Sequence, residues 1–210
     1  MQVIAHRGAS AYEKENTIAA FQKAQELGSN FFETDVQMTK DGVLVLWHDY
    51  DVRGRAVKTH TLAELQIARL EDLLAILRPG DMLNIEIKND GNIYPGIEEK
   101  ILNLLPPRVK KQILISSFDY PTLKRVRALD KQIKIGLLTR GFDVKQALEI
   151  KAYSVNISLK RATKEIAQIC HKNNLKLFVY TINTAREAAA IKALGADGVF
   201  SDYPDLKINY

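Results

Sequence analysis

The sequence predicts an α/β fold made of eight alternating strand and helix units, and three observations support this prediction. Short apolar, β-branched segments recur along all 210 residues, and amphipathic helical patterns separate them. Such segments are typical of strands buried on both faces of a parallel sheet. No glycine-rich G-x-G-x-x-G turn follows the first segment, which disfavours an open doubly wound sheet. Eight units therefore predict a TIM (β/α)8 barrel, near the short end of the usual length for that fold.

The predicted strands follow one another at the spacing that crossover helices require. Each is three to six residues long and is rich in Val, Ile, Leu or Phe. They are expected at residues 3–5, 31–36, 83–87, 113–117, 134–138, 154–158, 177–181 and 198–201.

Helix start signals lie between these strands. Asn16 is placed to cap a first helix. Thr61 with Glu64 forms a capping-box pattern at the start of one helical segment that extends to residue 77. Thr184 with Glu187 repeats this pattern before the last strand. Further helices are expected at residues 97–105, 121–129, 144–150 and 164–173.

One segment interrupts the alternation after the second strand. The sequence Thr-Lys-Asp-Gly at 39–42 is a turn signal, and residues 43–48 follow it as another apolar strand. We therefore expect a short β-hairpin excursion after strand two.

Composition restricts the class of protein. With 46% apolar and 26% charged residues, the chain is typical of a globular protein, and we expect one domain over residues 1–210. The single cysteine, Cys170, excludes a disulfide scaffold or a thiolate metal cluster. No apolar segment has the length of a signal region or a membrane span, so a cytoplasmic protein is expected. The net charge of +5 comes from scattered basic residues without interleaved aromatics, which disfavours nucleic-acid binding.

Acidic side chains stand late in two predicted strands that are expected to be neighbours. Glu33 and Asp35 point to one side of their strand, as do Glu86 and Lys88 of theirs, because strand side chains alternate. At an effective dielectric near 20, two like charges about 5 Å apart repel by roughly 3 kcal/mol, so three carboxylates at one barrel mouth require a cation or a proton. Oxygen ligands select a hard divalent ion. The sequence therefore predicts a site for Mg²⁺ or Ca²⁺.

Two histidines stand at the ends of apolar strands on the same part of the predicted rim. His6 follows the first strand and His48 ends the hairpin. Two imidazoles allow one to act as base and the other as acid toward a phosphate ester. Arg7, next to His6, offers a planar fork for phosphate oxygens. These residues together indicate acid–base phosphoryl transfer.

The same residues lie in motifs that resemble the glycerophosphodiester phosphodiesterase family. These motifs are Ile-Ala-His-Arg-Gly at 4–8, Glu-Asn-Thr at 15–17, Glu-Thr-Asp-Val at 33–36, Thr-Lys-Asp-Gly at 39–42, His-Asp at 48–49 and Ile-Glu-Ile-Lys at 85–88. Later segments at 116–118, 179–183 and 195–198 are also similar to family motifs. The likeness therefore spans almost the whole chain.

The resemblance implies a TIM barrel that hydrolyses glycerophosphodiesters, such as deacylated phospholipids, to glycerol 3-phosphate and an alcohol. By matching motif positions, it assigns His6 and His48 as the acid–base pair, Arg7 and Lys88 as phosphate ligands, and the acidic trio Glu33, Asp35 and Glu86 as ligands of a divalent metal. It also implies that a glycerol hydroxyl displaces the alcohol through a cyclic phosphate, which water then opens. Tyr180 stands where many relatives have tryptophan, and it is placed to pack against the glycerol carbons.

Two departures from the family pattern concern the mouth of the barrel. Lys14 replaces the proline that usually precedes Glu-Asn-Thr, which predicts a less rigid loop after strand one. The insertion that usually follows His-Asp is much reduced here, since few residues separate His48 from the helix expected at Leu62. We therefore hypothesise a more open mouth with altered selectivity for the alcohol group.

Two other interpretations of the sequence remain. A catalytically silent barrel would bind a phosphorylated ligand or a protein partner, and it would be favoured if a histidine or metal carboxylate were missing. A phospholipase D-type enzyme would keep the barrel and the metal but act on choline-bearing lipids. The first is disfavoured because no member of either set is missing, and the second because neither a secretion signal nor a disulfide pair is present.

Overall fold

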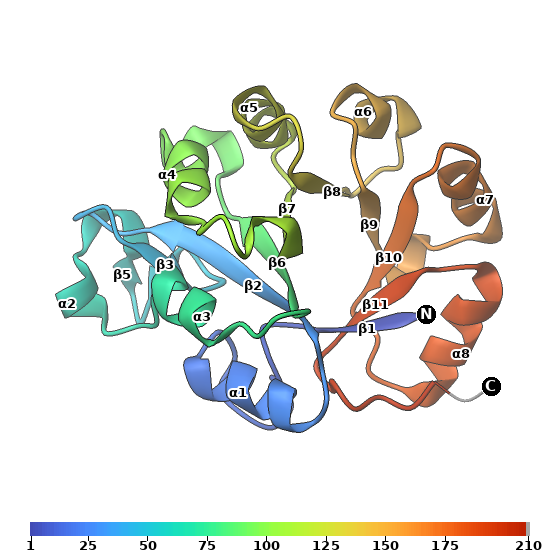
Figure 1. Cartoon of the computed structure of the whole chain (residues 1–210), viewed down its shortest axis with the longest axis horizontal. Helices are drawn as coiled ribbons and strands as arrows, with labels where there is room; N and C mark the ends of the chain where they lie inside the picture. The colour runs from blue at the N-terminus through green and yellow to red at the C-terminus, as the bar shows by residue number, and fades with distance from the viewer. Residues whose placement is uncertain (209–210) are drawn as a thin grey trace.

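The computed structural model describes residues 1–208 and contains a closed barrel of eight parallel strands. The strands follow in the order β1, β2, β6, β7, β8, β9, β10 and β11, and β1 pairs with both β2 and β11 to close the ring. Figure 1 shows the helices arranged around these strands. The prediction of a TIM (β/α)8 barrel is confirmed. The barrel strands are β1 (Gln2–Ala5), β2 (Phe31–Met38), β6 (Met82–Ile87), β7 (Ile113–Ser117), β8 (Lys134–Leu138), β9 (Ser154–Ser158), β10 (Lys176–Tyr180) and β11 (Gly198–Ser201).

The helices lie between the strands as the capping signals indicate, with two corrections. Thr17, rather than Asn16, caps α1, because Asn16 has a left-handed backbone and turns its side chain into the barrel mouth. The segment after Thr61 is two helices rather than one, because Gln66 adopts a left-handed conformation that ends α2. The helices are α1 (Ile18–Glu26), α2 (Leu62–Leu65), α3 (Leu70–Ile76), α4 (Ile97–Leu104), α5 (Tyr120–Leu129), α6 (Val144–Glu149), α7 (Lys164–Lys172) and α8 (Ala185–Leu194), with short 3-10 turns at η1 (Val57–Thr59), η2 (Asp90–Asn92), η3 (Lys110–Gln112) and η4 (Leu159–Arg161).

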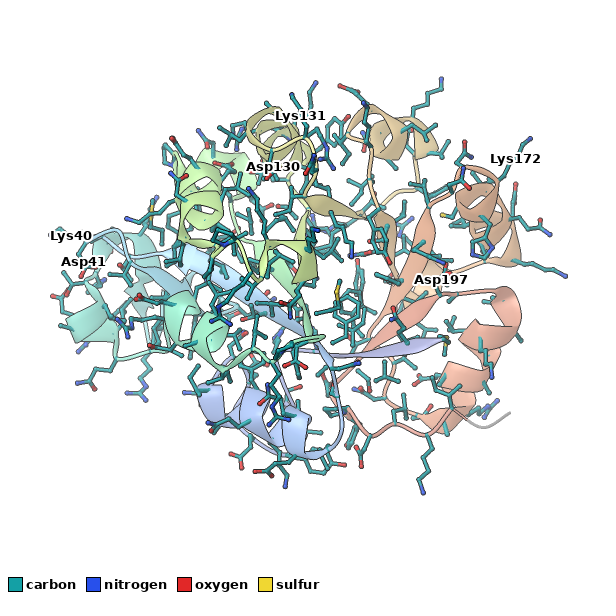
Figure 2. The ribbon with its side chains drawn as sticks, in the orientation of Figure 1. Lys40, Asp41, Asp130, Lys131, Lys172 and Asp197 are labelled. Atoms are coloured by element: carbon teal, nitrogen blue, oxygen red, sulfur yellow. The ribbon has the colours of Figure 1, made fainter. Side chains whose placement is uncertain are left out.

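The predicted hairpin excursion after strand two is also confirmed. Strand β3 (Leu44–Leu46) runs antiparallel to the end of β2, and Lys40 and Asp41 lie at the outer tip of this hairpin (Figure 2). The chain then forms a second, smaller hairpin from β4 (Asp51–Val52) and β5 (Arg55–Ala56), which the sequence did not predict. Together with η1 and α2, these elements form a small lobe beside the barrel that has its own cluster of buried apolar side chains.

Two layers of apolar side chains stabilise the barrel itself. The larger layer fills the space between the strands and the helices. The smaller layer fills the barrel interior, where Phe178 contacts Phe31, Phe200 and Tyr153 edge to face. Because strand side chains alternate, the residues that continue the interior rows past this aromatic layer point into the barrel mouth.

Ion pairs hold the opposite end of the barrel, where the strands begin. The Lys110 ammonium lies 2.7 Å from Asp130, and the Lys176 ammonium lies 2.8 Å from Asp197. Figure 2 labels both aspartates, Asp130 close to α5 and Asp197 close to β11. These contacts lie away from the carboxyl ends of the strands, where the active sites of TIM barrels form, so they serve stability.

Among residues 1–208, no helix combines the length and the apolar character that a membrane crossing requires. That residues 1–210 form one domain stays a prediction.

Candidate active site

A cavity of about 230 Å³ opens at the carboxyl ends of the barrel strands. Drug-sized ligands usually occupy cavities of roughly 300–1,000 Å³, so this one suits a smaller molecule. The cavity brings together most of the residues singled out from the sequence, from β1, β2, β6 and the loop after β3: His6, Arg7, Glu33, His48, Glu86 and Lys88.

Three carboxylates converge beside this cavity. Strand pairing places Asp35 directly opposite Glu86 on β6, and Glu33 lies two residues earlier on the same face of β2. One oxygen atom from each of the three side chains lies within 4.8 Å of the other two. This all-oxygen set could hold a hard divalent cation.

The mutual repulsion of the three carboxylates favours the binding of a positive charge among them. Burial, together with the charges of Asp35 and Glu86, raises the pKa of Glu33 well above its usual value. Burial and the charge of Asp35 raise the pKa of Glu86 to about 7, although Lys88 opposes this shift. In the absence of a cation the site therefore tends to hold protons, which is the expected property of a metal site whose carboxylates repel one another. The donor chemistry and this charge balance fit a divalent metal.

His6 is held by Asp202, which was not among the site residues predicted from the sequence. The His6 Nδ1 atom lies 2.7 Å from Asp202 Oδ1, while its Nε2 atom lies 4.0 Å from Glu33 Oε2. Burial would raise the pKa of Asp202, but hydrogen bonds from His6, Asn183 and Ser10 hold it at about 2. Since this carboxylate only accepts hydrogen bonds, Nδ1 carries the proton, and a neutral His6 presents Nε2 as a proton acceptor.

Arg7 and Lys88 lie in the site, and both contact carboxylates. The Arg7 Nη1 atom donates to both oxygens of Glu15, at 3.0 and 2.9 Å, and Nε lies 3.2 Å from Asp35. Burial opposes the charge of Arg7, but Asp35, Glu33 and Glu15 outweigh it and raise its pKa. The Lys88 ammonium donates to Glu86 at 3.1 Å. Both cations therefore stay charged at the cavity wall and offset part of the negative charge.

His48 also lines the cavity, from the loop after β3. Its Nδ1 atom lies 2.8 Å from Asp49, so its other ring nitrogen is available to a ligand, and the side chain is 37% exposed. The His6 side chain is only 19% exposed, so His48 lies nearer the opening of the cavity.

Tyr180 lines the cavity at the end of β10. Its ring contacts Phe118 and Phe200 edge to face, at 6.1 and 6.5 Å between ring centroids. These rings form an aromatic wall of the cavity that accompanies its charged groups, as a ligand with both a phosphate and a carbon skeleton requires.

Several residues that shape the site were not predicted from the sequence to act there. The Asn16 amide donates to Asp35 at 2.9 Å, and its carbonyl accepts from Thr34 at 2.8 Å. Glu15 holds the Arg7 guanidinium, and Asp202 orients His6. Glu15 and Asn16 lie in a motif quoted above, and Asp202 follows the last strand directly, at the position where polar residues of a barrel face the mouth.

A TIM barrel whose mouth combines two imidazoles, two charged basic side chains and three carboxylates that could hold a metal is typical of an enzyme of phosphate ester chemistry. Comparison with known proteins agrees with this class. The sequence profile of the glycerophosphoryl diester phosphodiesterase family matches residues 6–206. The chain therefore belongs to this family, and the resemblance noted from its motifs is confirmed.

Relatives cover nearly the whole chain. A glycerophosphodiester phosphodiesterase of Caldanaerobacter subterraneus subsp. tengcongensis is 36% identical over 233 residues, which cover 99% of this chain and 96% of that protein. One from Bacillus altitudinis is 32% identical and covers 97% of this chain and 95% of its own length.

Solved structures share the fold. A glycerophosphodiester phosphodiesterase from Thermotoga maritima superposes with a TM-score of 0.83 at 27% identity, covering 97% of this chain and 95% of that one. A phosphodiesterase from Oleispira antarctica, solved in complex with the product sn-glycerol-3-phosphate, gives a TM-score of 0.86 at 26% identity, covering 98% and 94%.

Proposed function

We propose that this enzyme hydrolyses glycerophosphodiesters to glycerol 3-phosphate and an alcohol, using His6 and His48 as the acid–base pair and a single divalent cation. The observation that carries the proposal is the convergence of three carboxylate oxygens within 4.8 Å of one another beside a cavity that both histidines line. Family membership over residues 6–206 supports the substrate class.

Each residue has a role that follows from its contacts. Glu33, Asp35 and Glu86 would hold Mg²⁺ or Ca²⁺, which when bound supplies positive charge that stabilises the charge developing on phosphate oxygens. Arg7 and Lys88 add fixed positive charge beside it and bind phosphate oxygens.

The histidines move the protons. One imidazole takes the proton of a glycerol hydroxyl as that oxygen attacks phosphorus, and the other gives a proton to the alcohol oxygen as its bond to phosphorus breaks. The product of this step is a cyclic phosphate, and water opens it with the two proton transfers reversed. Asp202 and Asp49 each hold one imidazole by its Nδ1 atom, so that Nε2 faces the reacting groups. Tyr180 packs against the glycerol carbons from the aromatic wall.

The test is metal-dependent release of glycerol 3-phosphate from glycerophosphoglycerol, measured by a coupled assay after chelation and after Mg²⁺ or Ca²⁺ is added back. We expect His6→Gln, His48→Gln and Glu86→Gln each to lower kcat by roughly 100-fold or more. His171→Gln is the matched control, since His171 is exposed and contacts Asp197 at the other end of the barrel. Full turnover by the His6 and Glu86 variants would refute the mechanism. A chain that folds and binds metal but releases no product would instead support the silent barrel.

A further inference from the structure

The aromatic wall of the cavity continues outward to two arginines. Phe118 and Tyr180 both line the cavity, and their rings contact each other edge to face. The guanidinium carbon of Arg140 lies 4.7 Å from the centre of the Phe118 ring, a stacked geometry that fixes its position. Arg140 is the second residue after β8, and Arg161 ends η4, which follows β9.

The positive charges of both arginines act on the hydroxyl group of Tyr180. Burial raises the pKa of the Tyr180 hydroxyl, and the charge of Glu86 raises it further, while the charges of Arg140 and Arg161 lower it. Both arginines are exposed, and they follow the carboxyl ends of the neighbouring strands β8 and β9, at the end of the barrel where the cavity opens.

These two charges differ from those of Arg7 and Lys88. Within residues 1–208, neither Arg140 nor Arg161 makes an ion pair, and Lys160 precedes Arg161 in the sequence. The acidic residues of neighbouring loops have other partners, because Asp119 accepts from the Thr122 amide and Asp143 from the Lys145 amide, each at the start of a helix. Unpaired positive charge is therefore concentrated at the outer edge of the aromatic wall.

The position of this edge determines which part of a substrate reaches it. The phosphorus must lie near the carboxylates and histidines, and a cavity of about 230 Å³ encloses only a small group such as glycerol. The alcohol, which varies in size among glycerophosphodiesters, must then extend through the opening. Along the aromatic wall, that path passes Arg140 and Arg161.

We propose that Arg140 and Arg161 form a subsite for the alcohol portion of the substrate and select alcohols that carry negative charge, above all a second phosphate. This inference rests on the proposed function and adds the substrate class. Two guanidinium groups bind phosphate oxygens well and repel the trimethylammonium group of choline. Diesters with an anionic alcohol are then preferred substrates, and glycerophosphocholine is a poor one.

The test measures kcat/KM of the metal-loaded enzyme on three diesters. The choline diester is glycerophosphocholine, the diester with a neutral alcohol is glycerophosphoglycerol, and the anionic diester is glycerophosphoglycerol with a phosphate on its outer glycerol. The Arg140→Gln, Arg161→Gln double variant is expected to lose roughly 3- to 30-fold in kcat/KM for the anionic diester, mostly through KM. The same variant should change kcat/KM for the diester with the neutral alcohol by less than about 2-fold, and it should raise kcat/KM for the choline diester. Added salt should reduce the preference of the wild type.

Arg108→Gln is the matched control, because Arg108 is equally exposed but precedes β7, at the opposite end of the barrel. It should leave the ranking of the three diesters unchanged. Equal turnover of all three diesters by the wild type, or an equal loss on all three in the double variant, would overturn the subsite and leave the proposed function intact. If the wild type hydrolyses none of them, the proposed function fails, and the subsite fails with it.

Discussion

Replacing Glu86 by glutamine should make the metal-free protein more stable at alkaline pH, although the residue is a proposed metal ligand. Burial and the neighbouring Asp35 raise the pKa of Glu86 to about 7, against an ordinary value of 4.5. The folded protein therefore holds a proton here that the unfolded chain has already released. The stability that this proton gives is complete below pH 4.5 and is lost as the pH rises through 7.

The size of the effect follows from the same values. At about 1.36 kcal/mol per pKa unit, ionising Glu86 in the folded protein costs about 3 kcal/mol once the pH exceeds 7. About 2 kcal/mol of this is lost between about pH 5.5 and about pH 8. Glu33, whose pKa is also raised, adds to the loss in the same direction. The low pKa values of Asp130 and Asp202, about 2 each, affect stability only in more acidic solution.

The assay is urea unfolding of chelator-treated protein at about pH 5.5 and at about pH 8, monitored by circular dichroism. We expect Glu86→Gln to unfold at higher urea near pH 8 and to show a smaller pH dependence than the wild type. Added Mg²⁺ or Ca²⁺ should stabilise the wild type and not the variant, because a ligand stabilises the state that binds it.

A matched control separates this effect from the removal of any buried carboxylate. Glu98 is also buried, but its carboxylate lies 2.8 Å from Arg125. Glu98→Gln should lower stability, since it removes the nearer charged partner of that guanidinium and leaves only Asp119 at 3.8 Å among the described residues. If Glu86→Gln were instead no more stable than the wild type near pH 8, or kept the full pH dependence, the electrostatic account of the site would be wrong.

Three further changes test other parts of the structure. Gly136→Ala should lower the free energy of unfolding by about 1–3 kcal/mol in urea titrations, because its Cβ would lie 2.9 Å from a buried side-chain nitrogen of β9. Thr184→Ala removes the capping box of α8 and should cost about 1 kcal/mol, measured in the same way. Asp202→Asn should lower kcat by roughly 10-fold or more and alter the pH–rate profile, because an amide no longer fixes the proton on Nδ1 of His6. Asp205→Asn should leave that profile unchanged, because the Asp205 carboxylate accepts from an exposed tyrosine hydroxyl away from His6.

The barrel was predictable because its determinants are local and repeated. Each parallel strand is a short apolar segment between helical patterns, and all eight predicted strands overlap those observed to within two residues. The errors arose where one residue adopts a left-handed conformation. Neither Asn16 nor Gln66 is a glycine, the residue that most often marks a left-handed turn of the backbone, so these turns were not predicted.

The charged side of the site was predictable because alternation along β2 and β6 determines which way Glu33, Asp35 and Glu86 point. Residues that position the side chains of the site were harder to predict. Asp202 lies at the other end of the chain from His6, and only closure of the barrel by pairing of β1 with β11 brings the two together. The same reasoning applies to Arg140 and Arg161, which lie on separate loops and were not predicted as site residues. Their charges matter because the barrel brings those loops to one aromatic wall, and the comparison of three diesters measures that consequence of closure directly.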